Sequence, residues 1–220
     1  MQFFVRVFAA LAIANCQSAL AANILSQIFG GRGETIPIQT LTLSDEQFLK
    51  GDSSGKPTTI YGTLRIAQGS GRLPLVILMH GSGGIEENIS AWERVFASLG
   101  ISTFAIDSFT GRGIVSTVAD QSQLGRLNMV LDLYRSLAVL AADARIDPGR
   151  VAVMGFSRGG QATLYASLKR FQKMWNPSGI DPADGCLGRG AHVAYSAKAT
   201  GATEEALKTL LERIYKLNEH

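Results

Sequence analysis

Residues 151–160 read VAVMGFSRGG. The apolar run at 151–154 is typical of a short buried strand, and the Ala- and Leu-rich segment 158–173 is typical of a helix. Between them, residues 155–159 form the pattern G-x-S-x-G, which in this context indicates a nucleophile elbow. Glycines are needed there because the turn is too tight for Cβ atoms beside the serine. We therefore expect Ser157 to be exposed on a strained turn. The alternative is an ordinary β-to-α connection.

Alternating strands and helices extend N-terminally from this stretch. Residues 75–79 (LVILM) and 101–106 are apolar runs that indicate strands buried on both faces. Apolar residues at helical spacing indicate helices at 88–99 and 124–142. From 75 to 173 the order is thus β, α, β, α, β, α, which predicts a parallel sheet covered by helices on both faces. Further elements are expected as half-buried strands at 38–43 and 58–66, a strand at 191–197 and an amphipathic helix at 204–217.

Length and composition limit the class of protein. The chain has 220 residues, of which 46% are hydrophobic and 18% are charged, which predicts one globular domain and excludes disordered, collagen-like and coiled-coil proteins. The net charge is +3 and the basic residues are scattered, so no nucleic-acid partner is expected. We find neither a phosphate-binding loop of Walker type nor metal-ligand spacing, so no cofactor or metal is expected.

The N-terminal segment predicts the compartment. A basic residue, Arg6, precedes an apolar stretch, and the segment ends in the small-residue pattern Ala19-Leu20-Ala21. This pattern is typical of a secretory signal peptide, here residues 1–21, followed by a single domain at 22–220. A membrane anchor is the weaker alternative, because polar residues interrupt the apolar stretch after about a dozen positions. We expect a periplasmic or secreted protein with no membrane span after cleavage.

A second glycine-rich loop, HGSGG at residues 80–84, follows the strand at 75–79. Its amides at Ser82 or Gly83, together with the amide of Arg158, are candidate donors of an oxyanion hole. His80 lies at the strand end, which favours a role in bracing this loop over a role as a base. Asp107 ends the next buried strand, where it would face the site or cap the following loop.

These motifs, in this order, resemble the dienelactone hydrolase family of the α/β-hydrolase superfamily. The resemblance rests on LVILMHGSGG at 75–84, DSFTGRG at 107–113 and IDPGRVAVMGFSRGGQATLYA at 146–166, and it covers about residues 58–175. It implies an α/β-hydrolase-type three-layer sandwich with a mostly parallel sheet. In one departure, enzymes acting on dienelactone use a cysteine nucleophile where this chain has Ser157, which favours serine esterase-like chemistry.

A serine nucleophile needs a histidine base and an acid that orients it, in this superfamily in the order Ser, acid, His. Only 63 residues follow Ser157, and the elbow helix and the terminal helix use about half of them. The roughly 30 residues that remain are too few for two further strand-helix units of about 30 residues each. His192 is the only histidine between the elbow and the last residue, so it is the candidate base, with Asp184 or Asp181 as the acid. The alternative is that His192 is simply a strand residue.

The C-terminal sequence resembles two separated parts of longer secreted family members. NPSGI at 176–180 resembles the segment after their elbow helix, and CLGRGAHVAYS at 186–196 resembles their very end. This implies an internal deletion near 180–184 that removed the last strands. Cys186 fits the loss of a disulfide partner, since Cys16 would leave with the signal peptide. An exposed sheet edge predicts self-association.

The expected function is hydrolysis of a small carboxylic ester or lactone through an acyl-enzyme on Ser157. The alternative function is that of a catalytically impaired or inactive remnant that binds a ligand or partner. A peptidase of the prolyl oligopeptidase type would need a larger lid or propeller than this length allows.

Overall fold

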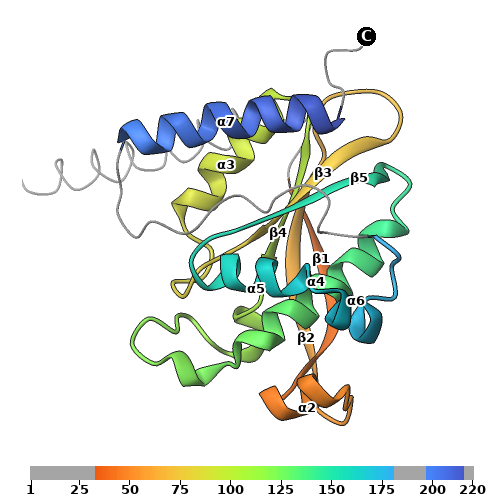
Figure 1. The fold of residues 1–220 in the computed structure, drawn as a ribbon, viewed down its shortest axis with the longest axis vertical. Coiled ribbons are helices and arrows are strands. Elements are labelled where there is room, and N and C mark those ends of the chain that lie inside the picture. Colours follow the sequence, from red (N-terminus) through yellow and green to blue (C-terminus); the bar gives the residue numbers. More distant parts are fainter. Residues whose placement is uncertain (1–32, 181–196, 216–220) are drawn as a thin grey trace, which may run out of the picture.

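The computed structural model describes residues 33–180 and 197–215, and five strands form one mixed sheet (Figure 1). The spatial order is β1-β2-β4-β3-β5. The strands are β1 (Glu34–Thr42), β2 (Lys56–Arg65), β3 (Leu73–Met79), β4 (Ser102–Asp107) and β5 (Ile146–Gly155). β4, β3 and β5 run parallel, whereas β1 and β2 pair antiparallel on one side. The prediction of parallel strands between 75 and 173 is therefore confirmed.

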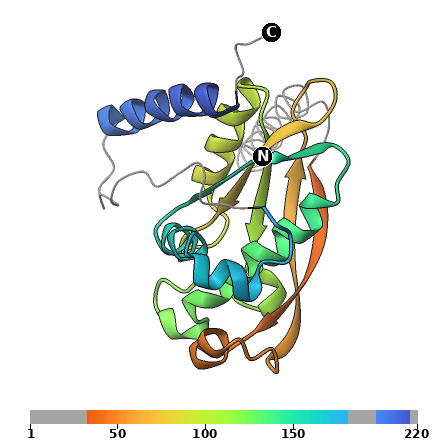
Figure 2. The same ribbon diagram turned by 45° about the vertical axis from the view of Figure 1, so that its right-hand side comes forward.

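Helices cover both faces of the sheet, which gives three layers. The α-helices are α2 (Asp45–Lys50), α3 (Glu87–Ser98), α4 (Arg126–Ala141), α5 (Arg158–Ala166), α6 (Lys169–Trp175) and α7 (Ala197–Tyr215), and two 3₁₀ turns are η1 (Thr110–Arg112) and η2 (Gln121–Gln123). Figures 1 and 2 show α4, α5 and α6 on one face and α3 with α7 on the other. The arrangement is the three-layer α/β sandwich that the sequence predicts.

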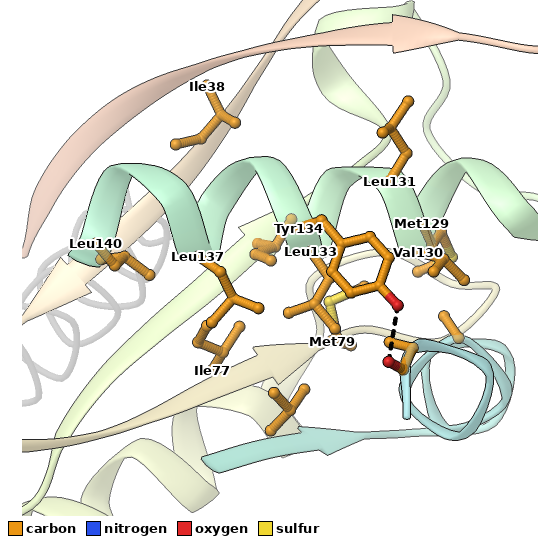
Figure 3. Packing of buried hydrophobic residues seen from close by; sticks show 14 of the residues in the cluster. Ile38, Ile77, Met79, Met129, Val130, Leu131, Leu133, Tyr134, Leu137 and Leu140 are labelled. Carbon is orange, nitrogen blue, oxygen red and sulfur yellow. Dashed lines mark hydrogen bonds between the residues drawn. The ribbon is translucent and has the colours of Figure 1, made fainter. Parts of the chain in front are cut away.

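The larger core lies between α4 and the sheet (Figure 3). α4 is buried along most of its length because apolar side chains recur at helical spacing, and Ile77 and Met79 of β3 meet it from the sheet. The Tyr134 hydroxyl donates a hydrogen bond of 2.7 Å to the Ala166 carbonyl at the end of α5. That bond fixes the helix that follows Ser157 against the core.

The smaller core lies under α3 and α7. Leu211 and Tyr215 of α7 are buried, and the Tyr215 hydroxyl donates to the Leu75 carbonyl at 3.2 Å. Leu207 packs beside them. The amphipathic C-terminal helix is thus confirmed, although it begins at Ala197 rather than at 204. The strand predicted for 191–197 lies outside the described residues except for Ala197, which is helical.

One local prediction is wrong, and one helix has no counterpart among the predictions. The segment 158–173 is two helices rather than one, because Leu168 is extended (ψ 120°). The break lets α6 turn so that Phe171 and Trp175 pack on Phe48, with ring centroids 5.1 and 5.4 Å away. Helix α2, which carries Phe48, was not predicted, although its capping box of Ser44 and Gln47 is a recognisable start signal.

Several sequence predictions concern residues beyond the described ranges. These are the signal peptide at 1–21, the deletion near 180–184 and the unpaired Cys186. Within residues 33–180 and 197–215, no helix is long and apolar enough to cross a membrane. Over the same ranges β5 pairs only with β3, so it ends the sheet.

Candidate active site

The turn between β5 and α5 holds Ser157 in an unusual backbone conformation. Its φ is 49° and its ψ is −111°, and among the described residues no other non-glycine residue has a positive φ. Such a conformation costs about 1–3 kcal/mol and persists only where the surroundings impose it. Here the Phe156 amide donates to the Met79 carbonyl (3.0 Å) and the Gly159 amide to the Phe156 carbonyl (2.8 Å). The G-x-S-x-G stretch therefore adopts the strained elbow expected from the sequence.

The two glycines of the motif are required by space. A Cβ on Gly155 would lie 2.3 Å from the Gly159 carbonyl oxygen. A Cβ on Gly159 would lie 2.4 Å from the carbonyl oxygens of His80 and Met79. Because no real Cβ approaches backbone atoms this closely, both positions exclude residues larger than glycine. The start of α5 is therefore in close contact with the end of β3.

The loop after β3 lies beside Ser157. Its turn closes with a 3.2 Å hydrogen bond from the Gly84 amide to the Gly81 carbonyl. A Cβ built on Gly81 would be 3.5 Å from Ser157 Cβ, so the loop and the serine are in contact distance. Among the described residues, no hydrogen bond occupies the amides of Ser82 and Gly83. The Arg158 amide opens α5 directly after Ser157, and Ser82 and Gly83 follow Gly81 in the loop beside the serine.

His80 is fully buried and its ring is committed to the backbone. Nδ1 donates to the Gly81 carbonyl at 2.7 Å, and Nε2 accepts from the Ser108 amide at 3.2 Å. Burial holds the pKa of His80 below its usual value of 6.5, which keeps the ring neutral. With both nitrogens occupied, His80 braces the loops after β3 and β4, in agreement with the favoured interpretation.

Asp107 caps the loop that follows β4. Its Oδ1 accepts hydrogen bonds of 2.9 Å from the amides of Phe109 and Thr110. The same residue lines an open hollow of about 390 Å³ together with Tyr61 and Ile85. Of the two roles left open, the hydrogen bonds show loop capping.

A buried ion pair anchors the Asp107–Gly113 loop from behind. Arg112 pairs bidentately with Asp132 of α4, at 2.8 Å from Nη1 to Oδ2 and 2.9 Å from Nη2 to Oδ1. The remaining donors are satisfied by Thr42 Oγ1 and by the carbonyls of Leu41 and Ser108. This network joins β1, α4 and the loop. It includes the carbonyl of Ser108, the residue whose amide donates to His80.

The side chain of Arg158 has a role that the sequence did not reveal. It is 3% exposed and donates from Nη1 to Gln121 Oε1 (2.6 Å) and the Gln121 carbonyl (3.2 Å), and from Nη2 to the Leu124 carbonyl. No carboxylate in the described ranges forms an ion pair with it. Burial, followed by the nearby charge of Arg126, lowers its pKa. Nothing in the sequence pattern marks Gln121, because it lies in a short 3₁₀ turn between the predicted strand and helix.

The candidate base and acid lie outside the part of the chain that the structure describes. His192, Asp184 and Asp181 all lie in 181–196, outside the described residues, as does His220. The described residues contain a single histidine, His80. They hold no cluster of three or more His, Cys, Asp or Glu side chains suited to a metal ion. The described part of the site therefore consists of the elbow serine and its flanking amides.

The sheet order, the elbow and the layering define the α/β-hydrolase fold. The chain is similar to the dienelactone hydrolase-like promiscuous phosphotriesterase P91 from metagenomic libraries, with 17% identity and a TM-score of 0.57, over 84% of this chain and 99% of that one. It is also similar to a protein named m3DLH, with 18% identity and a TM-score of 0.54 over the same shares. No protein-family model and no curated protein matches the chain in sequence.

Proposed function

We propose that this protein is a serine hydrolase of the dienelactone hydrolase family that cleaves small carboxylic esters or lactones through an acyl-enzyme on Ser157. The Ser157 Oγ attacks the substrate carbonyl, whose oxygen becomes an oxyanion. The amides of Ser82 or Gly83 and of Arg158 stabilise that charge. The oxyanion then collapses and the ester C–O bond breaks, so that the alcohol leaves with the proton that Ser157 gave up and the acyl group stays on Ser157. Water hydrolyses this acyl-enzyme, which frees the acid product and restores the Ser157 hydroxyl.

One observation carries the proposal: Ser157 alone among described non-glycine residues has a positive φ, at 49°. This strained backbone conformation lowers stability, and residues with such conformations cluster at functional sites. A strained serine at the start of a helix therefore points to a functional role. The contact of Gly81 with Ser157 brings free amides to the same place. The fold similarity to a protein described as dienelactone hydrolase-like agrees with a hydrolase.

We further propose that His192 is the general base and that Asp184, or Asp181 in its place, orients it. The order Ser157, aspartate, His192 along the chain is the order of the superfamily. The commitment of both His80 nitrogens to the backbone supports this assignment, because it removes the nearest alternative base. The signal-peptide pattern supports action in the periplasm or outside the cell.

A fluorophosphonate probe tests the nucleophile. The folded protein should be labelled once, and Ser157→Ala should abolish labelling, as read by intact-protein mass spectrometry. Ser167→Ala is the matched control, because Ser167 is the serine that follows α5 and its hydroxyl is bound to the Leu164 carbonyl. Folded wild-type protein that stays unlabelled contradicts the proposal.

Ester hydrolysis tests the base and the acid. His192→Ala should lower kcat toward the residual level of an oxyanion hole alone, about 10³–10⁴ over water, without loss of the circular-dichroism spectrum. Asp184→Asn and Asp181→Asn separate the two acid candidates, since only the orienting residue should lower kcat. Unchanged rates in His192→Ala would remove it from the mechanism.

The alternative function is an impaired or inactive remnant that only binds a ligand or partner. The observation that favours it is that β5 ends the described sheet, where the superfamily places further strands with the acid and histidine. A labelled but non-hydrolytic wild-type protein would support this alternative.

A further inference from the structure

We propose that Gln121 is a positioning residue for the oxyanion hole, and that its carboxamide joins the two loops that carry the candidate donors. The inference rests on the proposed function, which places those donors at Ser82 or Gly83 and at Arg158. Gln121 itself contacts no reacting atom. It acts through Ser82 on one side and Arg158 on the other.

One planar amide group reaches both residues. Gln121 Nε2 lies 3.0 Å from Ser82 Oγ, and Gln121 Oε1 lies 2.6 Å from Arg158 Nη1. The acceptor oxygen thus binds a cation while the amide nitrogen donates to the hydroxyl. The bridge runs from the loop after β3 to the first residue of α5.

The buried charge of Arg158 depends on the acceptors that Gln121 supplies. Arg158 is 3% exposed, and its guanidinium has no carboxylate partner in the described ranges. Carbonyl oxygens accept from Nη1 and Nη2, whereas the buried Nε has no acceptor among the described residues. A buried charge without such partners is strongly unfavourable. The side-chain and main-chain oxygens of Gln121 supply both acceptors of Nη1. The guanidinium therefore holds η2 in place beside the elbow.

The same loop fixes the orientation of a candidate donor. The Ser82 carbonyl accepts from the Thr117 amide at 2.8 Å and from Ser116 Oγ at 3.2 Å. Because the peptide unit is planar and trans, holding that carbonyl also sets the direction of the Gly83 N–H, which points the opposite way. Residues 116–121 thus hold Ser82 at both its carbonyl and its hydroxyl.

An oxyanion hole works because its donors are already aimed before charge develops. Removing one donor costs about 10²–10³ in kcat, so a donor that is present but poorly held should cost less, about tenfold. Substrate binding depends little on this aim. Loss of the bridge should therefore lower kcat and leave KM nearly unchanged.

The test compares two glutamines on the same 3₁₀ turn. Gln121→Met keeps the side-chain length but removes the hydrogen bonds, and we expect kcat for a p-nitrophenyl ester and the fluorophosphonate labelling rate to fall about tenfold. Gln123→Met is the matched control, because Gln123 Nε2 donates only to the Ser116 and Asp120 carbonyls of its own loop. Ser82→Ala should lower kcat by about as much as Gln121→Met does. The double variant should lower kcat little further, because both changes remove the same bridge.

A second readout does not depend on activity. The Thr117 amide reports the hold on Ser82, since it donates to that carbonyl. Its hydrogen exchange, measured by NMR, should rise about tenfold in Gln121→Met and stay unchanged in Gln123→Met. If Gln121→Met and Gln123→Met have the same rate of Thr117 amide exchange, or the same kcat, the inference is overturned. If wild-type protein is not labelled, the proposed function fails, while Thr117 exchange still decides the bridge.

Discussion

Ser157 shows how a single residue can store strain that its neighbours impose. Its backbone is held by bonds between strand and helix partners rather than by its own preference, since L-residues disfavour φ near 49°. The neighbouring glycines at 155 and 159 accept the close approach of backbone that makes this possible. The strain should therefore be measurable as lost stability.

Replacing Ser157 by glycine should release that strain. We expect Ser157→Gly to raise the free energy of unfolding by about 1 kcal/mol, the relief of strain less the flexibility of glycine. Chemical denaturation measures this, with Ser157→Ala as the control because alanine keeps the penalty. Equal stability of the two variants would contradict the prediction.

His80 should make stability depend on pH in a defined window. Its pKa is lowered from 6.5 by burial, so the unfolded chain binds a proton more readily than the folded protein does. The contribution is fully present above pH 6.5 and is lost as pH falls from there through the folded pKa. Urea unfolding at pH 7.5 and pH 5 measures the loss, which His80→Asn should diminish. A His80 imidazole signal that titrates above pH 6.5 in NMR spectra would contradict this prediction.

At the scale of elements, the buried Arg112–Asp132 pair joins β1, α4 and the loop after β4. Both side chains are almost completely buried, at 4% and 0% exposed. Removing one partner leaves a buried charge uncompensated, which costs about 3–5 kcal/mol. Arg112→Met should therefore destabilise the protein by that amount in denaturant titrations.

Two comparisons separate charge from packing in that prediction. Arg112→Met combined with Asp132→Leu should cost less than Arg112→Met alone, because no charge is then left unpaired. Lys50→Ala breaks an exposed pair with Glu46 and should cost only about 0.5 kcal/mol. If the double variant is as unstable as Arg112→Met, the unpaired charge of Asp132 is not the cause of the lost stability.

At the scale of the whole molecule, the sheet ends at β5 within the described ranges. Apolar side chains near that end are exposed on α5 and just after it, at 51% for Leu164 and 46% for Leu168. Unpaired strand edges beside apolar surface promote association. We therefore predict that the protein self-associates.

Sedimentation velocity tests this association. Leu164→Lys with Leu168→Lys should shift the protein toward monomer, whereas Val139→Lys, at a 40% exposed position on α4, should not. A monodisperse wild-type monomer that unfolds cooperatively would count against the suspected loss of strands.

The local features around Ser157 are encoded in the residues next to it. The apolar runs placed the central strands, and the glycine pattern predicted the strained turn, because backbone sterics and periodicity act over a few neighbouring residues. The bracing role of His80 followed from its place at a strand end. These predictions are confirmed for the described residues.

The way in which distant segments meet depends on the packing of the whole fold. The tertiary structure placed β4 between β2 and β3, and it packed α6 on α2 after the break at Leu168. It also brought Gln121 between Ser82 and Arg158. Such contacts join residues 37 to 39 positions apart, and no local pattern encodes them because they depend on how the layers pack.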